Sequence, residues 1–268
     1  MLALNPGRAE DPLILALPNG RILGEVMPLL HRVGIMPEAA FDDPGSRQLR
    51  FTTNEPRLDL IRVRSFDVAT FVAFGSAQLG VAGNDVLMEF DYSEIYAPLD
   101  LDVGHCHLAV AATADGAARE NVGRASHIRV ATKYPEITRR HFATRGVQAE
   151  CIKLNGAIEL APHLGLCRHI VDLVQTGATL KANGLIELER VAEVSSRLIV
   201  NRPELKTRPE EVGGWIERFR GAIGHIAQRG PLIHPALRAG STLSRIAGEG
   251  AEWSQAGEGG AAPAKRGS

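Results

Sequence analysis

The chain has 268 residues, a net charge of −1, 44% hydrophobic and 23% charged residues. This composition is typical of a globular protein with a sizeable core, folded as one large or two small domains. The near-zero charge argues against bulk binding to nucleic acid or membrane, so any anion site must be a local concentration of arginine and lysine. No apolar run is long enough to span a bilayer and no secretion signal opens the chain, so we expect a cytoplasmic protein.

The three cysteines, Cys106, Cys151 and Cys167, lie far apart and form no Cys-x-x-Cys pair. A disulfide framework or a zinc knuckle is therefore not expected. The triplet His105-Cys106-His107 has metal-binding residue types, but it falls in a strand-like run, where alternate side chains point to opposite faces. We therefore interpret this triplet as structural and expect no metal site built from protein side chains.

Apolar patterns predict strands and helices that alternate along most of the chain. Strands are expected over residues 12–17, 49–53, 58–63, 79–82, 99–112, 128–131, 150–154, 170–174 and 186–200. Helices are expected over residues 22–34, 66–75, 135–145 and 157–161, from residues 83 and 180, and finally from residue 209. This alternation predicts an α/β protein with mainly parallel sheets flanked by helices, arranged as two lobes around a cleft.

The most informative segment is the run from Ile170 to Gly184. Its apolar strand carries Asp172, breaks at a turn containing Thr176, Gly177 and Thr179, and continues as a short helix. Free N–H groups and a positive dipole at the start of a helix favour phosphate, and the threonine hydroxyls add donors. A carboxylate in so apolar a strand needs a partner, and a vicinal diol would supply one. The pattern indicates a ribose 5-phosphate site, although an ordinary strand-to-helix turn would look similar.

Residues 172–185 resemble the phosphoribosyl-pyrophosphate loop of the ATP phosphoribosyltransferase family. Four further segments are similar to family blocks in the same order, at residues 15–22, 79–87, 129–135 and 155–162. The resemblance covers residues 13 to about 228. It implies two lobes like those of periplasmic binding proteins, with the active site in the cleft. Lobe I would comprise residues 12–105 and 190–230 and lobe II residues 106–189, while the Gly- and Ala-rich composition predicts a disordered tail over residues 231–268.

The resemblance implies a glycosyltransferase that joins N1 of the ATP adenine to C1 of phosphoribosyl pyrophosphate and releases pyrophosphate. This is the first step of histidine biosynthesis. Magnesium would be carried by the substrate phosphates. The chain looks like the short form of the family, because no regulatory domain follows the catalytic lobes. Such a chain is expected to form a homodimer that assembles with a regulatory subunit similar to histidyl-tRNA synthetase.

The family pattern also implies roles for particular residues. Arg21 and Arg47 would be the catalytic arginines, with Arg47 acting across a dimer interface. The residues expected to bind phosphoribosyl pyrophosphate are Glu159, Asp172, Gln175, Thr176, Gly177, Ala178 and Thr179. One departure is Asn19, which stands where the family commonly has lysine, so a positive charge near the phosphates is missing or comes from another group.

Two other functions fit parts of the pattern. A two-lobed binding module without catalysis could use the same cleft for a small anion. A base-salvage phosphoribosyltransferase would share the phosphate loop, but such enzymes usually carry two adjacent acids in the loop strand, where this chain has only Asp172. Substituting free bases for ATP would separate the two transferases.

Overall fold

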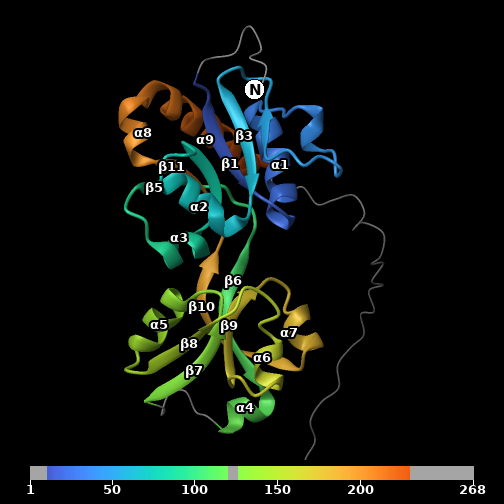
Figure 1. Ribbon diagram of the computed structural model, residues 1–268, viewed down its shortest axis with the longest axis vertical. Helices are drawn as coiled ribbons and strands as arrows, with labels where there is room; N and C mark the ends of the chain where they lie inside the picture. The colour runs from blue at the N-terminus through green and yellow to red at the C-terminus, as the bar shows by residue number, and fades with distance from the viewer. Residues whose placement is uncertain (1–10, 120–125, 230–268) are drawn as a thin grey trace, which may run out of the picture. The chain divides into compact units, whose positions relative to one another are not determined.

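The structure is a computed structural model that describes residues 11–119 and 126–229. Two sheets organise this part of the chain (Figure 1). The first, which with its helices we term lobe I, has the strand order β2-β3-β1-β4-β11-β5. Its strands are β1 (Leu13–Pro18), β2 (Arg50–Thr52), β3 (Leu58–Val63), β4 (Leu79–Gly83), β5 (Ile95–Asp100) and β11 (Ser196–Asn201).

The second sheet, which with its helices we term lobe II, has the strand order β10-β6-β9-β7-β8. Its strands are β6 (Cys106–Thr113), β7 (His127–Thr132), β8 (Gln148–Lys153), β9 (His169–Val174) and β10 (Leu185–Val194). The chain passes from the first sheet to the second before β6 and returns after β10, and these two strands pair with each other (Figure 1). The two lobes are therefore joined by a pair of neighbouring crossovers.

Helices cover both faces of each sheet, and apolar side chains fill the layers between them. In lobe I, α1 (Arg21–Val33) and α9 (Pro209–Arg229) pack on one face, and α2 (Ser65–Ala73) and α3 (Asn84–Phe90) on the other. In lobe II, α5 (Pro135–Ala143) packs on one face, and α6 (Leu160–His163) and α7 (Ala178–Ala182) on the other (Figure 1). The remaining short elements are η1 (Ala39–Phe41), α4 (Ala114–Arg119) and α8 (Arg202–Thr207).

Helix α1 shows how the sequence specifies these layers. Its buried residues, Val26, Leu29, Leu30 and Val33, recur at helical spacing and form one apolar stripe. The helix ends at Gly34, which has a φ of 86° and donates its N–H to the carbonyl of His31. Glycine adopts this left-handed conformation without the steric cost that a side chain would add. The predicted helix and its end are confirmed.

The two-lobed α/β fold is as predicted, but two details of the prediction are wrong. The sheets are mixed rather than mainly parallel, since β2, β5, β6, β10 and β11 form antiparallel pairs. The expected single strands over residues 99–112 and 186–200 are each two strands that belong to different sheets. An apolar run does not show where a chain leaves one sheet for another, because both sheets bury the same types of side chain.

Gly80 in β4 provides a test of this packing. An added Cβ would lie 2.8 Å from a methyl group of Val72 and 2.9 Å from one of Val68. We expect Gly80→Ala to lower the free energy of unfolding by about 1–3 kcal/mol, because overpacking forces branched side chains and backbone to shift. Urea denaturation measures the change. Gly24→Ala is the control, since Gly24 lies in α1 and an added Cβ would meet no other group within 4 Å, so alanine should be tolerated or stabilising there.

The predicted lobe boundaries at residues 105/106 and 189/190 stay a prediction. The predicted disordered tail over residues 231–268 lies outside the described residues. Within the described ranges, no helix has both the length and the hydropathy that crossing a bilayer requires.

Candidate functional site

A cavity of about 260 Å³ lies where the predicted phosphate loop meets lobe I. We term it the loop cavity. It brings together eight of the nine predicted site residues, which come from α1, the start of α6, β9, the loop before α7 and the first turn of α7. Its lining is Arg21, Cys106, Glu159, Asp172, Leu173, Val174, Gln175, Thr176, Gly177, Ala178, Thr179 and Leu180. The ninth, Arg47, is exposed on the loop over residues 42–49 and does not line the cavity.

The loop between β9 and α7 has the backbone that the sequence predicts. Gly177 is the N-cap residue of α7, with a φ of 71° and a ψ of 0°, and no side chain caps the helix. The N–H of Ala178 points towards the hydroxyl of Thr176, at 3.4 Å. The next N–H groups of the first turn, from Thr179 onward, have no intrahelical partner, as at the start of any helix, and they remain available to an anion in the cavity.

Asp172 stands at the strand end of the same cavity. The sequence suggested a buried carboxylate, and the structure shows it half-buried, with Oδ1 accepting the N–H of Leu173 at 2.8 Å. Burial raises the pKa of Asp172 to about 6. The hydrogen bond from the Leu173 N–H lowers this pKa, and the nearby negative charge of Glu159 raises it. The carboxylate is therefore mostly ionised at neutral pH and presents acceptor oxygens to the cavity.

Arg21 lies on the lobe I side of the loop cavity, in the first turn of α1. Its guanidinium pairs with Glu25, one turn further along the helix. The other oxygen of Glu25 accepts the N–H of Gly104 at 2.7 Å, and Gly104 lies in the crossover that leads into β6. Glu25 therefore ties Arg21 to the connection between the lobes.

A second cavity of about 120 Å³ shares Arg21, Cys106 and Leu173 with the loop cavity and adds side chains from both lobes. We term it the inter-lobe cavity. Tyr134 of lobe II donates its hydroxyl to Asp85 of lobe I at 2.8 Å. Burial raises the pKa of both groups, so the tyrosine stays protonated and keeps donating.

Sequence reasoning missed most of the residues of this inter-lobe cavity. It named neither Asp85 nor Lys133 as a site residue, although both line the cavity, and the ammonium group of Lys133 lies 4.0 Å from the ring centre of Phe66. Both residues follow the end of a strand, where α/β sheets commonly bind their ligands. This position in the sequence could have identified them as candidate site residues. Cys106 also lines both cavities, but burial raises its thiol pKa, so it is a poor nucleophile at neutral pH.

The His105-Cys106-His107 triplet does not converge on one point. His105 is exposed beside Asp102, at 2.9 Å, while the ring of His107 contacts Glu187 at 3.0 Å. Across the described ranges, no group of three or more His, Cys, Asp or Glu side chains is placed to hold a metal ion. Glu159 stands at the N-cap position of α6 without capping it, and it lines the loop cavity.

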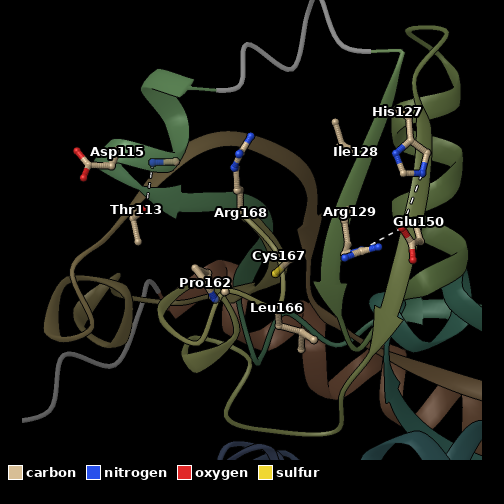
Figure 2. A pocket seen from close by; sticks show the side chains of 12 residues that line it. Thr113, Asp115, His127, Ile128, Arg129, Glu150, Pro162, Leu166, Cys167 and Arg168 are labelled. Atoms are coloured by element: carbon tan, nitrogen blue, oxygen red, sulfur yellow. Dashed lines mark hydrogen bonds and ion pairs between the residues drawn. The ribbon is translucent and has the colours of Figure 1, made fainter.

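A third and larger cavity, of about 520 Å³, lies elsewhere in lobe II (Figure 2). We term it the outer groove. It lies at the edge where β7 begins, whereas the phosphate loop follows the far end of the parallel strand β9. Figure 2 shows Arg129 facing Glu150, with Nε 2.9 Å from the carboxylate, and His127 lies 3.8 Å from the same group. Arg129 and Glu150 carry opposite charges, and none of the predicted site residues lines this groove.

Comparison with known proteins identifies the family of the chain. The family model described as HisG, ATP phosphoribosyltransferase, matches residues 64–221. The chain belongs to the ATP phosphoribosyltransferase family. A relative from Paramagnetospirillum magneticum named ATP phosphoribosyltransferase is 71% identical over 215 residues, which cover 80% of this chain and 98% of that protein.

Solved structures agree on the family's fold. The ATP phosphoribosyltransferase (HisG:HisZ) complex from Thermotoga maritima matches with a TM-score of 0.66 and 30% identity, over 80% of this chain and 99% of that chain. The periplasmic aliphatic sulphonate binding protein SsuA from Escherichia coli matches with a TM-score of 0.50 and 13% identity, over 82% of this chain and 71% of that chain. The second likeness concerns the fold alone.

Proposed function

We propose that the loop cavity is where this family member transfers a phosphoribosyl group to N1 of ATP, the first step of histidine biosynthesis. The observation that carries the proposal is that Arg21 of lobe I lines the same cavity as Asp172 and the loop over residues 175–179 of lobe II. A sugar held by the loop would therefore have a guanidinium on its other side, where the pyrophosphate leaves.

The 5-phosphate is assigned to the start of α7. Free N–H groups there, the hydroxyls of Thr176 and Thr179, and the open approach over Gly177 suit a phosphate dianion. Asp172 then accepts hydrogen bonds from the ribose hydroxyls, and Gln175 and Ala178 complete the wall of the cavity. Glu159, which lines the same cavity, would add a further acceptor for these hydroxyls.

The chemical step breaks the bond between C1 and the pyrophosphate oxygen while N1 of adenine forms a bond to C1. Negative charge grows on the leaving oxygen, and C1 develops oxocarbenium character. Arg21 donates to the leaving pyrophosphate, since a guanidinium grips phosphate oxygens and keeps its proton. The adenine enters from the inter-lobe cavity, which adjoins the loop cavity at Arg21, Cys106 and Leu173.

Magnesium is expected on the substrate phosphates, where it would neutralise leaving-group charge. Glu159 and Asp172 are the two acids that line the loop cavity, and they suit hydrogen bonds to metal-bound water rather than a complete ligand set.

Arg47, from a second subunit, remains our proposal for the other catalytic arginine. We also propose a cytoplasmic homodimer that assembles with a synthetase-like regulatory subunit, supported by the likeness to the HisG:HisZ complex.

The raised pKa of Asp172 predicts how binding of ribose 5-phosphate depends on pH. The ionised carboxylate accepts from the hydroxyls, so affinity should fall as pH drops through about 6. At one unit below this pKa only about a tenth of the groups are ionised, which predicts roughly tenfold weaker binding from this residue. The ligand phosphate also titrates near this pH, and Asp172→Asn is therefore the control. Titration calorimetry from pH 5 to 7.5 should show that the affinity ratio of wild type to variant rises with pH; a constant ratio would contradict the assignment.

The test of the function itself is pyrophosphate release. Release should require both ATP and phosphoribosyl pyrophosphate, and should stop when adenine or another free base replaces ATP. Activity with a free base would indicate a salvage enzyme. Tight binding of the sugar phosphate without turnover, alone or with the regulatory subunit, would indicate a binding module.

A further inference from the structure

Helix α3 of lobe I supplies the cap for helix α5 of lobe II. The carboxylate of Glu89 accepts the N–H of Glu136, at 3.1 Å to each oxygen, and the N–H of Ile137, also at 3.1 Å. Pro135 occupies the first position of α5 and has no N–H to satisfy. The exposed donors at the start of α5 are thus satisfied by a side chain from the other lobe.

The local sequence provides no substitute for this cap. Tyr134 is the N-cap residue of α5, and no side-chain cap hydrogen bond is formed from that position. Glu89 itself is buried, with 7% of its surface exposed. A buried carboxylate at the positive end of a helix, accepting N–H bonds, is a strong charge-assisted contact. If the lobes separated, the Glu89 carboxylate and the N–H groups of Glu136 and Ile137 would have to form hydrogen bonds with water instead.

Two more contacts lie along the same helix. Asp85, one turn before Glu89, accepts the hydroxyl of Tyr134 at 2.8 Å. The guanidinium of Arg140 donates to the carbonyl of Met88. The contact between α3 and α5 therefore runs from the wall of the inter-lobe cavity outward to the surface, with the Glu89 cap at its centre.

We propose that Glu89 is a positioning residue that holds the two lobes at the spacing at which Arg21 and Asp172 line one cavity. This inference rests on the proposed function. If the cap is lost, the lobes spend part of their time apart, and only the closed fraction binds substrate. Apparent affinity then falls in proportion to that fraction, while saturating substrates restore the closed arrangement.

Steady-state kinetics of Glu89→Ala tests this role. We expect the KM for both substrates to rise about tenfold while kcat stays within about twofold, because closure is then driven by binding. Glu89→Gln keeps an acceptor oxygen and should recover part of the loss, with a KM rise of about threefold. The matched control is Glu136→Ala, which removes an exposed acid from the same helix turn but leaves the cap intact.

A structural readout keeps the test decisive. Small-angle scattering of the free protein should give a larger radius of gyration for Glu89→Ala than for wild type, and equal values with both substrates bound. If the alanine variant does not fold, the glutamine variant decides.

Unchanged KM in a folded variant, a loss confined to kcat, or an equal effect in Glu136→Ala would each overturn the positioning role. If Asp172→Ala keeps the wild-type kcat/KM the proposed function of the loop cavity fails, whereas a normal KM in Glu89→Ala alongside the expected loss of about a hundredfold in Asp172→Ala removes only this inference.

Discussion

Replacing Arg21 by alanine is expected to lower kcat by about a hundredfold to a thousandfold, the usual effect of removing one donor to charge that develops in a transition state. Arg21 is the one arginine that lines the loop cavity within the described residues. It is held there by Glu25, whose other oxygen binds the Gly104 N–H. Because the leaving pyrophosphate gains charge only as the bond to C1 breaks, the loss should fall on kcat more than on KM.

Two further variants show whether the loss of kcat comes from the missing guanidinium of Arg21. Arg21→Lys keeps the charge but loses the fork geometry, so it should recover only part of the rate. Arg32→Ala removes an exposed arginine from the last turn of the same helix and should leave turnover unchanged. If Arg21→Ala kept kcat within about threefold of wild type while folded, a difference of under ~0.7 kcal/mol, Arg21 could not be the pyrophosphate-binding group.

Asp172→Ala is expected to lower kcat/KM for phosphoribosyl pyrophosphate by at least about a hundredfold, since hydrogen bonds to a charged acceptor contribute about 1.5–3 kcal/mol each. The carboxylate is oriented by the Leu173 N–H at 2.8 Å and opens on the loop cavity. Its loss removes the acceptor for the ribose hydroxyls in the ground state and, more strongly, in the transition state, where C1 develops positive charge that a nearby carboxylate stabilises. We therefore expect a raised KM for the sugar substrate together with a lower kcat.

The control for this variant is Asp115→Ala. Asp115 is an exposed acid of lobe II that lines the outer groove instead. Pyrophosphate release and calorimetry with ribose 5-phosphate would measure both variants. Wild-type affinity for the sugar phosphate in Asp172→Ala would show that the hydroxyls bind elsewhere.

Local sequence was sufficient to predict the phosphate loop. An apolar strand, a Thr-Gly turn and a short helix are contiguous, and Gly177 has the positive φ that such a turn requires. The Arg21 position was also predictable, because it follows the end of β1. In these segments, the residues that determine the backbone are the same residues that would contact the ligand.

Contacts between the lobes could not be predicted in this way. The Tyr134–Asp85 bond and the Glu89 cap join residues nearly fifty positions apart in the chain. They depend on where the crossovers at Gly104 and Ser195 take the chain from one sheet to the other. The apolar runs continue through both crossovers, so the sequence pattern does not show where they occur. One signal was present: Pro135 starts a helix whose N-cap position holds Tyr134 instead of Ser, Thr, Asp or Asn, which indicates a cap supplied from elsewhere.

A crystal structure of the protein with ribose 5-phosphate tests the central claim most directly. Our account predicts the phosphate on the N–H groups at the start of α7, beside Thr176 and Thr179, with both ribose hydroxyls within hydrogen-bond distance of Asp172. A ligand bound in the outer groove near Arg129, with the loop cavity left to solvent, would contradict it.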